Sequence, residues 1–286
     1  MSESADPGAR TAFLTGATSG IGRWSALGLA KAGYRVIAAG RDRQRGEELR
    51  AWITARIPAA HIEVVTADLS LMAEVRRLAG HVRERAPRLH VLVNNAGLAR
   101  RSRVVTEEGH ELTLAVNHLA PFLLTRELLP PLTAAGGARI VNVGSVASDR
   151  ARIDLDDLES ARNWSTMRAY GRSKLALMIA TFEWARRLDP NAVTANVVHP
   201  GGVATAIGDV GGGPGLAWRL IKPFLLSPEQ GARTTLHVAT SSVLAGVTGR
   251  YFKREAPAEP NPLAKDTDLA AKLWARTDAM VDAARP

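Results

Sequence analysis

Short apolar runs alternate with longer amphipathic segments along most of the chain. The runs are rich in Val, Ile, Leu and Ala, as in strands buried on both faces of a parallel sheet, and the segments between them repeat apolar residues at helical spacing. The predicted strands cover residues 11–14, 34–39, 62–66, 89–93, 138–143, 193–198 and 250–252. The predicted helices cover residues 23–31, 42–56, 71–86, 107–129 with a bend at Pro121, and 165–188. This order predicts a single α/β domain over residues 1–286 with helices on both faces of the sheet.

Two segments, residues 147–164 and 201–227, stand outside this alternation. Each follows a predicted strand, and open α/β sheets bind ligands at the carboxyl ends of their strands. In the second segment a glycine-rich stretch precedes the apolar residues 216–226, which include Trp218, Leu220 and Phe224. A helix docked permanently on the core fits this pattern. We favour a lid within residues 201–227 that closes over a bulky lipophilic substrate.

The composition excludes several kinds of protein. The 286 residues contain no cysteine, which removes disulfides, thiolate catalysis and cysteine-ligated zinc, and we expect no metal. The net charge of +9 comes from dispersed arginines, and the 5% of aromatic residues do not interleave with them, so we expect no nucleic-acid partner. Residues 1–8 are polar, and no apolar run reaches the length of a membrane-spanning helix. We therefore expect a cytoplasmic protein without stable membrane insertion.

The clearest motif is the glycine turn Thr15-Gly-Ala-Thr-Ser-Gly-Ile-Gly22, between the first strand and the first helix. Glycines let the backbone approach a pyrophosphate closely, and the helix that follows offers free N–H groups and the positive end of its dipole. An ordinary strand–helix turn is the alternative. The residues expected to cradle the phosphates are Gly16, Thr18, Ser19, Gly20, Ile21 and Gly22.

The end of the second strand predicts the choice of dinucleotide. Arg41 lies 19 residues after Gly22 (41 − 22), within reach of a ribose 2′-phosphate, and therefore indicates NADP(H). Asp42 follows immediately and would suit the free 2′-hydroxyl of NAD. The two charges also fit a solvated helix start.

The candidate chemistry lies in Tyr170-Gly-Arg-Ser-Lys174. Tyr170 and Lys174 are spaced one helical turn apart, and a nearby ammonium would lower the pKa of the phenol toward neutrality. Such a pair suits proton exchange with a carbonyl or hydroxyl oxygen, although the spacing alone also fits a surface pair. Ser145 closes the fifth strand without a nucleophile-elbow context, and His199 at the end of the sixth is interpreted as a loop histidine bonded to backbone.

Together these motifs resemble the short-chain dehydrogenase/reductase family over nearly the whole chain. The resemblance implies a Rossmann fold with a seven-stranded parallel sheet, and a catalytic set in which Tyr170 is the general acid/base and Ser145 orients the substrate oxygen. Lys174 would bind the nicotinamide ribose, and Asn117 would hold a water in the proton relay. The further cofactor contacts implied are Asp68, Leu69, Asn95, Ala96, Gly97, Pro200, Gly201, Val203 and Thr205.

Within that family the chain is similar to the retinol-dehydrogenase-like branch. The similarity lies in Leu155-Asp-Asp-Leu158, in Thr248-Gly-Arg-Tyr-Phe252 and in the 25 residues that separate Ser145 from Tyr170 (170 − 145). It implies NADPH-dependent reduction of a ketone or aldehyde on a bulky lipophilic substrate, or the reverse alcohol oxidation, by a chain that can form homo-oligomers. The alternatives are an NADP(H)-sensing protein without turnover and an NAD(P)-dependent epimerase or dehydratase, for which the C-terminal region is short.

Overall fold

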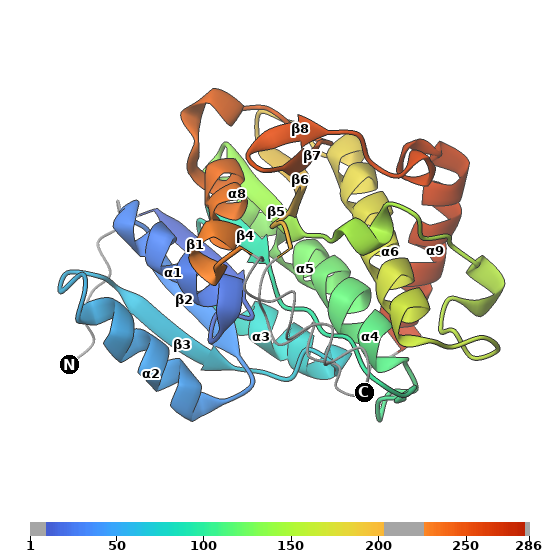
Figure 1. Cartoon of the computed structure of the whole chain (residues 1–286). Helices are drawn as coiled ribbons and strands as arrows, with labels where there is room; N and C mark the ends of the chain where they lie inside the picture. The colour runs from blue at the N-terminus through green and yellow to red at the C-terminus, as the bar shows by residue number, and fades with distance from the viewer. Residues whose placement is uncertain (1–9, 203–225, 284–286) are drawn as a thin grey trace.

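The computed structural model describes residues 10–202 and 226–283, which form one sheet with helices on both faces (Figure 1). The sheet order is β3-β2-β1-β4-β5-β6-β7-β8, and all neighbours pair in parallel except β7 and β8. The strands are β1 Thr11–Thr15, β2 Arg35–Gly40, β3 Ile62–Thr66, β4 Val91–Asn94, β5 Ala138–Val143, β6 Val193–His199, β7 Tyr251–Lys253 and β8 Ala256–Ala258.

The predicted doubly wound fold is confirmed, with one strand added at the edge. The expected parallel strands are β1 to β7, and the short antiparallel β8 pairs with β7, with Phe252 opposite Pro257. Proline cannot donate to the sheet ladder and occurs in strands at edges, which is where β8 lies. A three-residue strand with a central proline carries no strand signal in the sequence.

Two apolar cores lie on opposite faces of the sheet because neighbouring residues of each strand point to opposite sides. Phe13 belongs to the core covered by α3, α5, α6 and α9, whereas Leu14 belongs to the core covered by α1, α2 and α8. The helices are α1 Gly20–Lys31, α2 Arg43–Thr54, α3 Met72–Arg85, α4 Leu112–Leu114, α5 Ala120–Ala135, α6 Thr166–Arg187, α8 Pro228–Thr240 and α9 Thr267–Ala283. Among the described helices, none combines the length and apolar content needed to span a membrane.

Helices α8 and α9 are not among the predicted helices, and the long helix expected over residues 107–129 follows a different course. It begins at Leu112, after a bridge between Val105 and Glu111, and passes through a π-helical turn at Ala115–Leu119 before α5. The irregularity therefore lies before Pro121, which occupies the first turn of α5, where proline is tolerated. The predicted bend at Pro121 stays a prediction, and the π-helical turn just before it carries Asn117.

The strand order reverses at β1, which pairs with β2 on one side and with β4 on the other. Leu14 lies opposite both Ala38 and Val93, so the carboxyl ends of the three strands reach the same edge. Such a switch point opens a crevice for a ligand at the carboxyl ends of the strands. The glycine turn, Arg41 and Asn95 all follow these strand ends.

Candidate active site

The glycine turn brings the start of α1 against the end of β1. Gly16 has φ +65°, and a Cβ built on Gly22 would lie 2.0 Å from the carbonyl oxygen of Gly16, so Gly22 admits no side chain. The Asn95 side-chain amide donates to the carbonyls of Thr15 and Gly16 at 3.0 Å each and holds the turn from below. The side-chain amide of Asn95 is thus bonded to the turn itself. The backbone N–H groups of Asn95 and Ala96 both donate to the hydroxyl of Thr15.

The first turn of α1 is suited to an anion. Its N-cap, Ser19, makes no side-chain capping bond, and no acidic residue lies in the first turn. By contrast, Asp42, Ser165 and Ser227 cap α2, α6 and α8 with side-chain oxygens. The N-terminal N–H groups of α1 therefore lack the side-chain acceptor that these other helices have, as expected where a phosphate binds.

At the end of the crevice where an adenosine would bind, Arg41 and Asp42 differ in their hydrogen bonding. Arg41 is exposed just after β2, and its guanidinium makes no hydrogen bond or ion pair with the described residues. The carboxylate of Asp42 accepts the backbone N–H of Arg45 at 3.1 Å, so it caps α2. Asp68 also accepts a backbone N–H, from Ser70 at 2.9 Å, beside the buried Leu69. Arg41 and Arg43 are the charged side chains here that a ligand could bind without breaking a hydrogen bond or ion pair among the described residues, and Arg41 lies nearer the strand end.

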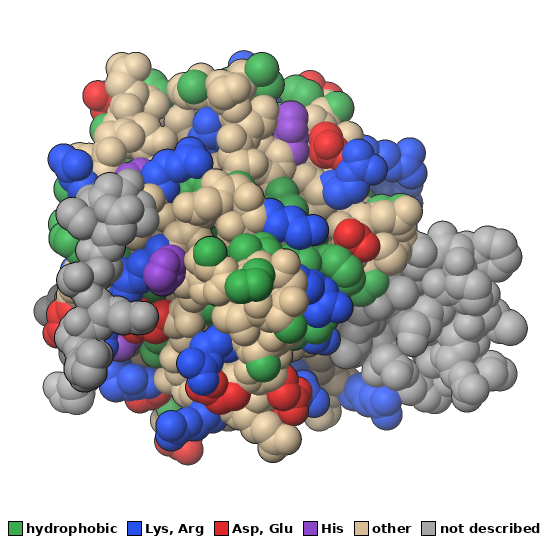
Figure 2. All heavy atoms as spheres, turned by 90° about the vertical axis from the view of Figure 1, so that its left-hand side faces the viewer, with side chains coloured by type: hydrophobic (Ala, Val, Ile, Leu, Met, Phe, Trp, Pro, Cys, Tyr) green, Lys and Arg blue, Asp and Glu red, His purple; other side chains and the backbone are tan. Residues whose placement is uncertain are grey.

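Basic side chains on this side of the molecule are dispersed, as the sequence predicts. Figure 2 faces the side that lies on the left in Figure 1, where α2 and β3 are found. Lys and Arg side chains form several separate groups there, with Asp and Glu between them. The described residues of this face form no continuous basic stripe of the kind that tracks a nucleic-acid backbone.

The structure brings Ser145 and Tyr170 together. Ser145 begins the turn after β5, and its hydroxyl accepts the N–H of Ala147 at 3.2 Å. Burial raises the pKa of Tyr170, and a hydrogen bond with the Ser145 side chain opposes this rise. Tyr170 therefore keeps its proton at neutral pH, in contact with the hydroxyl expected to orient a substrate oxygen.

Lys174 lies one turn further along α6 and is only 3% exposed. Its ammonium donates to the carbonyl of Val143 at 2.8 Å, and burial lowers its pKa to about 8. A Cβ on Gly97 would lie 3.1 Å from this nitrogen, so Lys174 fills the space under Gly97. Burial and Ser145 determine the pKa of Tyr170 in this structure, and the Lys174 ammonium bonds to Val143, so the predicted lowering of the Tyr170 pKa by Lys174 stays a prediction.

Asn117 is fully buried in the π-helical turn and bonds to Leu98 and Ser173. Its amide nitrogen donates to the Leu98 carbonyl at 2.9 Å and to the Ser173 hydroxyl at 3.0 Å, and its oxygen accepts the Leu98 N–H at 2.9 Å. These bonds join the segment after β4 to α6, between Tyr170 and Lys174. The predicted water-holding role of Asn117 stays a prediction.

The turn that carries Ser145 is held by residues that the sequence analysis did not select. The Asp149 carboxylate accepts bonds from the Lys253 ammonium at 2.7 Å and the Tyr251 hydroxyl at 3.3 Å, both on β7. The Asn261 amide donates to the carbonyls of Ser148 at 2.8 Å and Ala151 at 3.0 Å. The 250–252 strand signal placed Tyr251 correctly, but nothing in the sequence pairs β7 with the turn after β5.

His199 is the last residue of β6, and its environment keeps it neutral. Burial, together with the positive charge of Lys253, lowers its pKa to about 4. Its Nδ1 is buried without a hydrogen-bond partner among the described residues, so the predicted backbone bond is not formed there.

The residues after β6 that were predicted to contact the cofactor are described only in part. Gly201 has φ +90°, and a Cβ built on it would lie against the Leu226 side chain. Pro200 is half-buried beside it. The predicted cofactor contacts Val203 and Thr205, and the predicted lid apart from its ends, lie outside the described residues.

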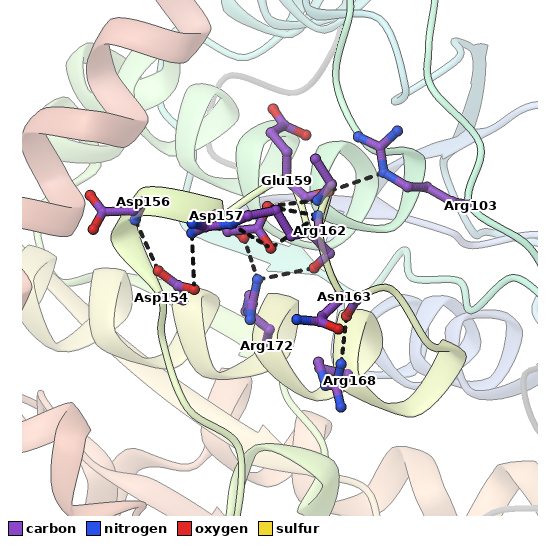
Figure 3. Close-up of polar contacts among 11 residues, drawn as sticks. Arg103, Asp154, Asp156, Asp157, Glu159, Arg162, Asn163, Arg168 and Arg172 are labelled. Carbon is purple, nitrogen blue, oxygen red and sulfur yellow. Dashed lines mark hydrogen bonds and ion pairs between the residues drawn. The ribbon is translucent and has the colours of Figure 1, made fainter.

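A second polar region lies on the segment before α6 and is separate from this site. A cavity of about 460 Å³ is lined by acidic and basic side chains and not by Ser145 or Tyr170. Figure 3 shows Arg172 at its centre, where the buried guanidinium donates to the Asp157 carbonyl and to the Ser160 hydroxyl. Arg172 thereby fastens the segment over α6 on the side away from Tyr170.

Within the described residues, no group of three or more His, Asp or Glu could hold a metal.

Comparison with known proteins agrees with this geometry. The family described as short chain dehydrogenase matches residues 10–210. Human retinol dehydrogenase 13 is 36% identical over 97% of this chain and 86% of its own length, and mouse polyprenol dehydrogenase is 41% identical over 93% and 82%. Among solved structures, the NADP active-site complex of Pseudomonas aeruginosa RhlG is 29% identical with a TM-score of 0.69, covering 85% of this chain and 94% of that one.

Proposed function

This chain belongs to the short-chain dehydrogenase family, and from this premise we propose that it uses NADP(H) to interconvert a carbonyl and an alcohol on a bulky lipophilic substrate. Membership makes it an oxidoreductase that works with a nicotinamide dinucleotide. The observation that carries the proposal is the hydrogen bond between Ser145 and Tyr170, with Lys174 one turn away on α6. This is the arrangement that proton exchange on a substrate oxygen requires.

The residues present fit the dinucleotide. The side-chain-free contact between Gly16 and Gly22 and the uncapped start of α1 would receive the pyrophosphate. Arg41, with its guanidinium uncommitted among the described residues, would pair with a 2′-phosphate, whereas Asp42 is already bonded as a helix cap. The NADP complex of the RhlG structure supports the same choice by analogy. When bound, the nicotinamide ring would supply or accept the hydride.

The chain's own side chains would manage the proton on the substrate oxygen. The raised pKa of Tyr170 keeps it a neutral phenol, which is the form that donates a proton to a carbonyl oxygen during reduction. Ser145 would hold the same oxygen in place through its hydroxyl. Lys174, with a pKa near 8, would carry positive charge at neutral pH and favour the phenolate left after proton transfer.

The substrate class follows from the relatives and from the chain's own sequence. The relatives are named for retinol and polyprenol, both long apolar alcohols. The apolar residues 216–226 would suit a substrate of this kind. A sensor without turnover would not need Ser145, Tyr170 and Lys174 together, so we favour the enzyme.

The test is the oxidation of NADPH with a panel of carbonyl compounds, from polycyclic and long-chain ketones and aldehydes to small polar ones. We expect turnover with the lipophilic members, and Tyr170→Phe should reduce it by at least about 100-fold, the lower range for acid–base catalysis, with NADPH binding retained. Preference for sugars or short polar acids would contradict the substrate class. Retained turnover in Tyr170→Phe would contradict the role of the phenol.

A further inference from the structure

The π-helical turn at Ala115–Leu119 connects the proposed site to the C-terminal helix. Asn117 of this turn bonds to the segment after β4 and to α6. The next residue, His118, contacts α9 instead, where its Nε2 lies 2.8 Å from the Thr277 hydroxyl. All three side chains are fully buried. The turn is therefore held on one side by the site and on another by α9.

A π-helical turn depends on its surroundings more than a regular helix does. It contains one residue more than an α-helical turn, and such turns are rare and frequently occur at functional sites. Here the N–H of Ala120 donates to the carbonyl of Ala115, which is the bond that defines the turn. If the turn relaxed to an α-helix, one residue would leave it and its neighbours would rotate by about 100° around the axis. The Asn117 amide would then lose its partners.

The helix that carries Thr277 is fixed to α5 by contacts on both sides of this residue. Trp274 lies three residues before Thr277, and its ring packs edge-on against Phe122 of α5 with the centroids 4.8 Å apart. Asp278 follows Thr277 and pairs with Arg126 of α5. Figure 1 shows α9, in red, alongside α6. Thr277 is therefore a fixed point against which the π-helical turn can be held.

The bonds of Asn117 lead to the groups proposed to act on the substrate. The Ser173 hydroxyl accepts a bond from Asn117 at 3.0 Å and donates to the Tyr170 carbonyl at 2.8 Å. A Cβ built on Gly97 would lie 3.3 Å from the Asn117 oxygen and 3.1 Å from the Lys174 nitrogen, so both groups border the same glycine. A shift of the π-helical turn would therefore reach the surroundings of Tyr170 and Lys174.

We propose that Thr277 is a positioning residue for the active site and that it acts through His118 and the π-helical turn. This inference rests on the proposed function, in which Asn117 serves the proton transfer from Tyr170. The alternative is that the bond between His118 and Thr277 only stabilises the packing of α9. Positioning requires a loss of turnover in a protein that stays folded, whereas packing alone does not.

Thr277→Val tests the proposal because it removes the hydroxyl and keeps the branched shape. A misplacement of about 1 Å at a catalytic group can cost about 100-fold in rate, so we expect a smaller shift to lower kcat for carbonyl reduction by about 5- to 20-fold. The KM for NADPH should not change. Thr277→Ser restores the hydroxyl and should return kcat to within about twofold of the parent. A kcat that serine does not restore would overturn the proposal.

Thr125→Val is the matched control. Thr125 lies on α5 and is buried like Thr277, but its hydroxyl has no hydrogen-bond partner among the described residues. Valine there should leave kcat unchanged, and thermal unfolding checks that each variant is folded at the assay temperature. Equal losses of kcat in Thr125→Val and Thr277→Val would show that any buried hydroxyl has the same effect and would overturn the proposal.

Hydrogen exchange of the Ala120 N–H tests the same coupling without turnover, so failure here is distinct from failure of the proposed function. In Thr277→Val this amide should exchange at least about tenfold faster relative to the amides of β1, because the bond that defines the turn opens more often. Thr125→Val and Thr277→Ser should follow the parent. Unchanged exchange at Ala120 in Thr277→Val would overturn the proposal, whatever the turnover.

Discussion

Gly171 lies so close to Ala147 that a Cβ built on it would come within 2.8 Å of the Ala147 carbonyl oxygen. The two residues follow Tyr170 and Ser145 closely, so this approach packs the helix carrying the phenol against the turn carrying the hydroxyl. The absent side chain at position 171 is therefore a condition for the bond between Ser145 and Tyr170. Gly171 lies within a regular helix, so glycine is needed here because it has no side chain and not because of an unusual backbone conformation.

Gly171→Ala should separate the catalytic pair. The backbone carbonyl of Ala147 cannot rotate away as a side chain could, so the turn or α6 must shift. Because a misplacement of about 1 Å at a catalytic group can cost about 100-fold in rate, we expect turnover to fall by about 10- to 100-fold. Overpacking should also cost about 1–3 kcal/mol in the free energy of unfolding, measured in urea.

Gly80→Ala is the matched control for that variant. Gly80 lies inside α3, and its nearest neighbour to an added Cβ is the end of the Arg83 side chain at 3.9 Å. Alanine there should keep turnover and raise stability by about 0.5–1 kcal/mol. Normal turnover in Gly171→Ala would show that the close contact does not position Ser145.

Arg41→Ala tests the choice of dinucleotide. If Arg41 pairs with the 2′-phosphate, the variant loses a charge-assisted bond worth about 1.5–3 kcal/mol and binds NADPH about 10- to 150-fold more weakly. Binding of NADH should stay nearly unchanged. Fluorescence titration of both cofactors measures the two affinities. An equal loss for NADPH and NADH would move the phosphate contact to Arg43 or Arg45.

Lys253→Met tests the attachment of the Ser145 turn to β7. Asp149 would lose its 2.7 Å ion pair and keep the longer bond to Tyr251. The pair is about one-third exposed, so its energy is small, about 0.2–1 kcal/mol, and we expect kcat to fall about 2- to 5-fold. The KM for NADPH should not change, because the turn contacts the substrate end of the site.

Two further variants decide whether Lys253 positions the turn or only adds stability. Lys253→Arg keeps the ion pair and should restore kcat. Arg50→Met removes an exposed pair with Glu47 on α2, far from the turn, and should leave kcat unchanged. If Lys253→Met and Lys253→Arg lower stability and kcat alike, positioning by charge is excluded.

Local sequence signals were sufficient for most of the fold and for the residues that touch the reacting groups. Strands such as Arg35–Gly40 contain a continuous apolar run, and the start of α6 has a serine cap at Ser165, so each is encoded within a few residues. The motifs around Gly16 and Tyr170 are equally local. The helix expected over 107–129 failed because its apolar spacing continues across a bridge and a π-helical turn that periodicity does not distinguish.

What the sequence could not predict depends on contacts between distant residues. Asp149 and Lys253 are 104 positions apart, and only the sheet order brings β7 beside the turn after β5. The pKa of Tyr170 follows burial, which the spacing of Tyr170 and Lys174 does not reveal. The same applies to Asp42, whose role as a cap for α2 removes it from the cofactor choice only once the backbone N–H of Arg45 is located.

His118 provides a pH-dependent test of the core beside the active site. It is fully buried next to Asn117, its Nε2 contacts the Thr277 hydroxyl at 2.8 Å, and burial lowers its pKa to about 3. As pH falls below about 6.5, His118 becomes protonated in the unfolded chain but stays neutral in the folded one. The contribution of His118 to the free energy of unfolding is therefore complete above that pH and is lost as pH falls toward 3. His118 alone should account for a loss of about 2 kcal/mol between pH 7 and pH 5.

His118→Gln should be less stable than the parent at pH 7, because it disturbs a packed site, but should lose about 2 kcal/mol less between pH 7 and pH 5. His199, with a pKa near 4, contributes a similar fall in the same range, so the variant should remain sensitive to acid. The exposed His61 supplies the control, and His61→Gln should follow the parent at both pH values. Urea unfolding at pH 7 and pH 5 measures all three proteins. If His118→Gln and the parent lose equal stability, His118 takes up its proton in the folded state at ordinary pH, and the buried core is open to water at that position.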